Sequence, residues 1–142
     1  MICWFWKQHA DGNNSWVGHA INVASPTAAL QEALIALSLT RYGRVHPDQA
    51  VVLRGQRAYS KTLALVQQAL YDESLMWRDD TLAAIRAMTM YELFEVTTND
   101  PTAWQQHIAG ITRLMQLRGP QRHQTPMAQA VLEDARYGLV SI

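Results

Sequence analysis

The sequence predicts an all-α fold: one domain, a bundle of about five helices with a central buried helix. The length of 142 residues suits a single domain. All five prolines stand at positions typical of helix ends. Between them, apolar residues recur at helical spacing, and no pair of segments shows the alternation expected of paired strands.

The first two helices follow from caps and periodicity. One is expected over residues 26–41, with Ser25 as N-cap and Tyr42-Gly43 as its stop. The next is expected over residues 47–71. It is the clearest amphipathic segment, with apolar side chains on one side and charged ones on the other. The charged side carries Arg54, Arg57 and Lys61.

The third helix is expected from Asp79 or Asp80 to about residue 96. Its apolar residues surround the helix axis, which is typical of a buried helix. Its few polar residues, Glu92 and Glu95 above all, therefore need partners. The candidate partners are Arg86, Arg113, Arg118 and His107.

Two further helices complete the bundle. Residues 101–118 follow Asp100-Pro101 and place apolar residues and one histidine on a shared face. A last helix is expected over residues 126–138, with Thr125 as N-cap.

The N-terminal segment is treated apart from the helical domain of residues 25–142. Residues 1–24 carry Trp4, Phe5, Trp6 and Trp16, which are too apolar for a free tail. We expect this segment to dock on the bundle or on a partner chain, where it could form a homodimer.

Composition excludes several classes of function. The 12 Lys and Arg residues balance 12 Asp and Glu residues, and the arginines are spread out, so neither nucleic acid nor a membrane surface is an expected partner. One cysteine leaves no disulfide or cysteine-based zinc site within the chain. No motif indicates a metal or cofactor, so none is expected. Without a signal peptide or membrane span, an intracellular chain, cytoplasmic or nuclear and not secreted, is expected.

Several short stretches, in order, resemble the regulatory (middle-homology) domain of fungal zinc-binuclear-cluster transcription factors. They fall between residues 28 and 120: 33–37, 59–65, 79–84, 91–95, the Trp104-x-x-His107-x-x-Gly110 spacing, and 117–120. The resemblance implies an all-α fold with a role in sensing or protein contact. The six-cysteine DNA-binding cluster of that family is absent. We therefore expect a natural, shortened, stand-alone relative without DNA binding.

The predicted site lies between the third and fourth helices, near the turn that joins them. His107, Glu92 and Glu95 are the candidate catalytic or polarising groups, because a histidine and a carboxylate in an apolar cavity tune each other's pKa. The candidate ligand-binding residues are mostly aromatic or long apolar side chains: Trp104, Tyr91, Met88, Ile108, Ile111 and Tyr59. The structural alternative is that these residues fill the core and bond one another.

Three functions remain open from the sequence. The first is a regulatory-domain relative that binds a hydrophobic small molecule in secondary metabolism. The second is a cofactor-independent cyclase, pericyclase or isomerase acting on a hydrophobic fungal metabolite, which needs mainly positioning and a few aimed dipoles. The third is a protein-interaction or dimerisation fragment. A closed apolar pocket of several hundred Å³ favours the first two.

Overall fold

The computed structural model describes residues 16–23, 25–95, 109, 113, 116–117, 119 and 125–131. Within them the secondary structure is helical: α2 (Trp16–Ile21), α3 (Ala28–Val45), α4 (Gln49–Leu70), α5 (Glu73–Met76) and α6 (Asp79–Phe94), with a further helical stretch at 126–131. The described part contains no strand. The all-α prediction is confirmed.

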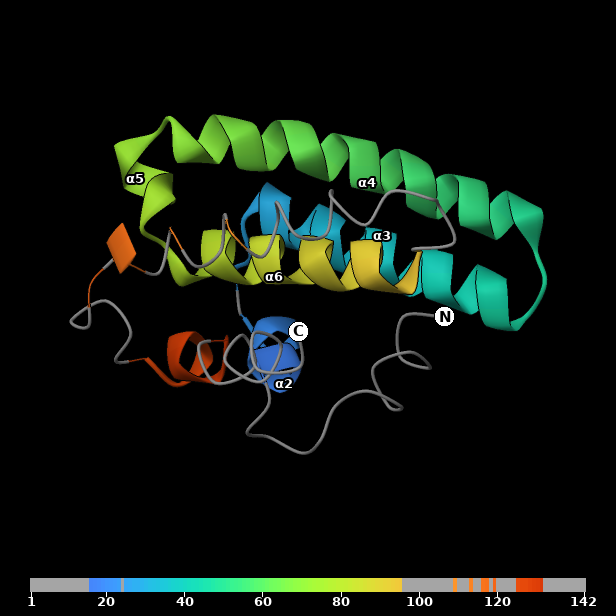
Figure 1. The fold of residues 1–142 in the computed structure, drawn as a ribbon, viewed down its shortest axis with the longest axis horizontal. Helices are drawn as coiled ribbons and strands as arrows, with labels where there is room; N and C mark the ends of the chain where they lie inside the picture. The colour runs from blue at the N-terminus through green and yellow to red at the C-terminus, as the bar shows by residue number, and fades with distance from the viewer. Residues whose placement is uncertain are drawn as a thin grey trace.

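The helices pack in layers, with α6 in the middle (Figure 1). Helix α4 lies across one side of α3 and α6, whereas α2 and residues 126–131 lie on the other side. Helices α3 and α6 run parallel (Figure 1). At their starts the Thr27 backbone N–H donates to the Asp80 carboxylate, and at their ends Arg44 donates to the Glu95 carboxylate. Helix α4 runs antiparallel to α6.

The predicted central helix is confirmed in α6. Leu82, Ala83, Ala84 and Ala87 are fully buried, and they belong to one core that also includes Trp16, residues of α3 and α4, and Val131. Burial weakens toward the C-terminal end of α6, where Leu93 is half exposed. Three polar residues of the predicted site, Tyr91, Glu92 and Glu95, lie at this end of α6.

Helix starts follow capping chemistry. The Thr125 side chain accepts a hydrogen bond from the backbone N–H of Ala128, so the predicted cap is confirmed there. The Asp48 side chain accepts from the Val51 N–H and caps α4, which therefore begins at Gln49, two residues after the expected start. Ser25 was the wrong residue for the first helix. Its N-cap is Thr27, whose hydroxyl accepts from the Leu30 N–H at 3.4 Å.

The stop predicted at Tyr42-Gly43 is also wrong, since α3 continues to Val45. Gly43 serves a different purpose: a Cβ there would lie 2.7 Å from Val52 Cγ2 and 2.9 Å from the Val52 backbone nitrogen. The glycine therefore allows α4 to approach α3 closely instead of ending the helix.

Two short helices were not predicted, α2 and α5. In α2, Trp16, Val17 and Ala20 are buried in the core. Trp16 thus packs on the bundle, whereas Trp4, Phe5 and Trp6 lie outside the described residues, and the docking of residues 1–15 stays a prediction.

Candidate functional site

The structure describes part of the predicted site. Helix α4 supplies Tyr59, α6 supplies Met88, Tyr91 and Glu92, and Glu95 follows directly after α6. The other predicted site residues lie outside the described residues: Trp104, His107, Ile108 and Ile111.

Tyr59, Tyr91 and Glu92 form a compact cluster between α4 and α6, called here the tyrosine–carboxylate cluster. The rings of Tyr59 and Tyr91 stack with centroids 4.0 Å apart and planes 6° apart. The Tyr59 hydroxyl donates a hydrogen bond to Glu92 Oε1. Tyr91 is buried, whereas Tyr59 and Glu92 are partly exposed, so the polar end of the cluster can reach solvent.

Burial dominates the electrostatics of this cluster. It raises the pKa of Tyr59 far above the usual value, and the hydrogen bond to Glu92 and the charge of that carboxylate raise the pKa further. Burial also raises the pKa of Tyr91, an effect that the neighbouring Thr40 hydroxyl partly offsets. Both phenols are therefore neutral hydrogen-bonding groups at physiological pH.

Thr40 on α3 borders this cluster. Its side chain is only 2% exposed, and its hydroxyl oxygen makes no hydrogen bond of ordinary geometry among the described residues. The oxygen lies against Gly55 of α4, where a Cβ would come within 2.1 Å of it. The helices cross here at close range, and the Thr40 hydroxyl lies beside both Gly55 and the Tyr91 phenol.

Glu95 has a different partner from the ones the sequence suggested. Its carboxylate accepts two hydrogen bonds from Arg44 of α3, from Nε at 3.2 Å and from Nη2 at 3.0 Å. One turn earlier on α3, the Arg41 guanidinium lies 5.0 Å from the centre of the Phe94 ring. These contacts fasten the end of α6 to α3.

The missed partners, Tyr59 for Glu92 and Arg44 for Glu95, carry no local sequence signal. The Arg44–Glu95 contact joins residues 51 positions apart and the Tyr59–Glu92 contact joins residues 33 apart. Only the parallel packing of α3 on α6, and the crossing of α4 over them, brings these groups together.

Met88 belongs to the core: it is 6% exposed and packs within the main apolar cluster. A cavity of about 90 Å³ exists among the described residues, but it lies near the starts of α3 and α6 and none of the predicted site residues lines it. The tyrosine–carboxylate cluster is therefore a surface of aromatic and polar groups, and the described cavity is a separate feature.

The described residues hold no group of three or more histidine, cysteine or acidic side chains able to share a metal ion. None of the described helices combines the length and apolar character needed to cross a membrane.

Comparison with known proteins assigns the sequence to a family. Residues 3–136 match the family described as the fungal specific transcription factor domain. The chain is also 27% identical, over 118 residues, to an uncharacterized protein of Emericella nidulans. That alignment covers 83% of this chain but 23% of the relative, so the chain corresponds to about a quarter of the longer protein.

No solved structure matches the chain significantly. The family match extends over nearly all of the sequence, including every helix described above, and it agrees with the resemblance carried by the short sequence stretches. This chain belongs to the fungal specific transcription factor domain family.

Proposed function

We propose that this chain is a regulatory module that binds a hydrophobic small molecule at the tyrosine–carboxylate cluster, in the setting of fungal secondary metabolism. The observation that carries the proposal is the Tyr59–Glu92 hydrogen bond beside the stacked Tyr59 and Tyr91 rings. It combines an aromatic wall with one partly exposed carboxylate, the kinds of group that line small-molecule sites, although the described residues around it form an open surface and not a closed pocket.

In this proposal the aromatic rings of Tyr59 and Tyr91 bury the apolar body of the ligand. The Glu92 carboxylate accepts a hydrogen bond from a hydroxyl or N–H group of the ligand, either beside the Tyr59 hydroxyl or in its place. Trp104, His107, Ile108 and Ile111 would supply further walls and a second polar group.

Binding requires less of the site than catalysis, because a ligand needs Glu92 only as a hydrogen-bond acceptor, and the Glu95 carboxylate is already held by two hydrogen bonds from Arg44. A carboxylate that acts as a general acid or base has to reach the proton it transfers. As part of the same proposal, we place the chain inside the cell, in the cytoplasm or nucleus, where transcription-factor domains act.

The experiment compares two probes that differ by one hydroxyl group, 2-naphthol and naphthalene, by fluorescence titration of the full chain. We expect saturable binding of both, with 2-naphthol bound more tightly. Glu92→Gln should weaken 2-naphthol binding by about fivefold, because a hydrogen bond to a charged acceptor is worth about 1 kcal/mol more than one to a neutral acceptor. Naphthalene binding should hardly change.

Glu32→Gln is the matched control. Glu32 also accepts a hydrogen bond from a side chain of another helix, that of Lys61 at 3.1 Å, but it lies outside the cluster. Replacing the Glu32 carboxylate should change the binding of neither 2-naphthol nor naphthalene. Absence of saturable binding, or a Glu92→Gln chain that binds 2-naphthol as the wild type does, would reject this site and favour a role in protein interaction.

A further inference from the structure

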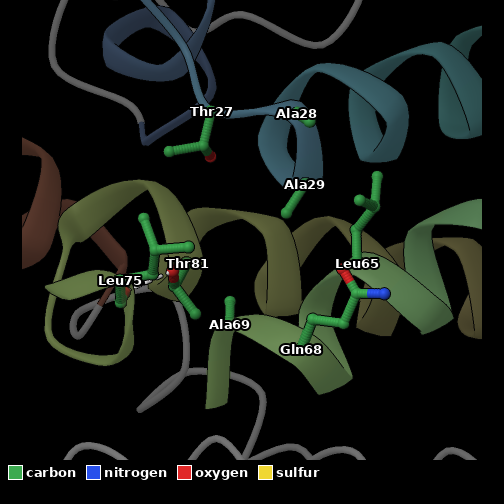
Figure 2. A pocket seen from close by; sticks show the side chains of 8 residues that line it. All are labelled: Thr27, Ala28, Ala29, Leu65, Gln68, Ala69, Leu75 and Thr81. Atoms are coloured by element: carbon green, nitrogen blue, oxygen red, sulfur yellow. Dashed lines mark hydrogen bonds between the residues drawn. The ribbon is translucent and has the colours of Figure 1, made fainter. Parts of the chain in front are cut away.

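A second feature of the fold is the cavity of about 90 Å³ at the opposite end of α6 from the tyrosine–carboxylate cluster. It lies where the start of α3 meets the end of α4, with α5 and the first turn of α6 closing one side (Figure 2). Four helices converge here, and their side chains leave an open centre between them.

The side chains that line this cavity are mostly apolar, and three of them are alanines. Ala28 and Ala29 face it from α3 and Ala69 faces it from α4, while Leu65 and Leu75 complete the apolar lining. Ala29 and Ala69 are both buried, at 5% and 3% exposure. Because alanine stops at Cβ, these positions keep open a space that larger apolar side chains would fill.

The two threonines that line the cavity already have hydrogen-bond partners. The Thr81 hydroxyl donates to the Leu75 carbonyl at 2.7 Å (Figure 2). The Thr27 hydroxyl accepts from the Leu30 N–H, and its backbone N–H donates to Asp80 Oδ2 at 2.8 Å. The two threonines therefore need no water molecule as a hydrogen-bond partner. An apolar group bound in the cavity would leave neither of their hydroxyls unpaired.

The volume of the cavity limits the size of the group that it can hold. It is several times larger than the roughly 10–15 Å³ that one water needs, yet smaller than the ~150 Å³ apolar cavity that accepts benzene. Ala28 and Gln68 are exposed lining residues, so the cavity can be reached from the surface beside them.

We propose that this cavity binds a branched alkyl group of about four or five carbon atoms, carried by a small uncharged molecule. The group sits among the three alanines and two leucines, and any hydroxyl it carries points toward the Gln68 amide at the exposed rim. This site is independent of the proposed function, because its lining shares no residue with the tyrosine–carboxylate cluster.

The probes are 3-methyl-1-butanol and xenon, titrated into the full chain and followed by NMR of its methyl groups. Saturable chemical-shift changes are expected at the methyls of Ala29, Ala69, Leu75 and Thr81, with the methyls of Met88 unmoved. Ala69→Leu places a larger side chain in the cavity and should abolish these changes. Ala64→Leu, the same substitution at an exposed position of α4, should leave them intact.

Ala28→Leu provides a second filling variant at the exposed rim, in case the buried substitution prevents folding. Loss of the saturable shifts in a folded filling variant supports the site. Shifts that stay linear with probe concentration, or that persist in both folded filling variants, overturn it. Since Glu92→Gln leaves this cavity untouched, the outcome is separate from the outcome of the naphthol experiment.

Discussion

At the scale of single residues, glycine decides how closely α3 and α4 approach. A Cβ at Gly55 would lie 2.1 Å from the Thr40 hydroxyl oxygen and 2.7 Å from the Thr40 backbone nitrogen. Gly43 of α3 has the same relation to Val52 of α4. The two glycines lie on different helices. Each lacks a side chain at a point where the backbone of the other helix comes close.

Gly55→Ala should therefore destabilise the protein, although alanine is the better helix former by about 1 kcal/mol. We expect a net loss of about 1–3 kcal/mol, because the added methyl group overpacks the crossing. Chemical denaturation measures the change. Thr40→Ala in the same chain should recover part of the loss by removing the hydroxyl but not the backbone contact, and Ser60→Ala on the exposed side of α4 is the control. A more stable Gly55→Ala protein would contradict this packing.

Residue-scale chemistry also fixes the response to alkaline pH. Tyr59 and Tyr91 have pKa values raised above the ordinary value of 10 in the folded state, chiefly by burial. Their neutral forms therefore stabilise the fold fully below pH 10. That contribution is lost as the pH rises above 10, because these tyrosines then ionise more readily in the unfolded chain.

We predict that stability falls steeply above about pH 10. An absorbance titration of phenolate should show two tyrosines that ionise only together with unfolding. Tyr59→Phe should reduce the number of such tyrosines by one and weaken the loss of stability with pH. Reversible titration of all tyrosines of the folded chain near pH 10 would contradict the burial of the Tyr59 and Tyr91 phenols.

At the scale of helices, one buried carboxylate aligns α3 with α6. Asp80, 5% exposed, lies in the first turn of α6, where acidic residues are favoured by the helix dipole. Its Oδ2 accepts the backbone N–H of Thr27, the N-cap of α3, at 2.8 Å. Arg78 lies 3.8 Å from the other oxygen. One side chain thus couples the starts of two parallel helices.

Asp80→Ala should cost about 1–3 kcal/mol, since it removes a charged acceptor and leaves the Thr27 N–H without it. Thermal unfolding measures the loss. Asp72→Ala is a suitable comparison, because Asp72 is an exposed cap whose hydrogen bonds stay within α5. The melting temperature should fall more for the first variant than for the second, whose loss is that of one exposed cap. Equal effects would show that Asp80 acts only as a local cap.

At the scale of the whole molecule, the balance of charges determines whether the chain binds nucleic acid. The sequence carries equal numbers of acidic and basic residues and a single cysteine. Among the described residues, basic groups such as Arg44 and Lys61 pair with carboxylates on other helices. A six-cysteine zinc cluster cannot be built from the one cysteine present in this sequence.

We predict that the isolated chain does not bind duplex DNA in a sequence-dependent manner at physiological salt. Gel retardation with duplexes of varied sequence tests this, with a competitor excess of unrelated DNA. A retarded band that survives the competitor and weakens with rising salt would contradict the prediction.

The sequence by itself determined the long helices α3, α4 and α6 and their order, but it did not indicate the short helices α2 and α5. The Thr125 cap, the amphipathic face of α4 and the all-round apolar character of α6 are local patterns, because capping and burial depend on residues a few positions apart. It also indicated that Glu92 needs a partner, because a polar group on a buried helix requires one, and it named Tyr59 and Tyr91 as candidate aromatic ligand-binding residues.

The tertiary structure alone decided which partners those residues have. Tyr59 with Glu92, Arg44 with Glu95, and Thr40 against Gly55 are contacts between different helices, set by the direction and depth of packing. The same holds for Gly43, which the local pattern marked as a helix stop but which α4 requires for close approach. The cavity among Ala28, Ala29 and Ala69 is likewise a property of four converging helix ends, because short side chains open a space only where their neighbours also fail to fill it.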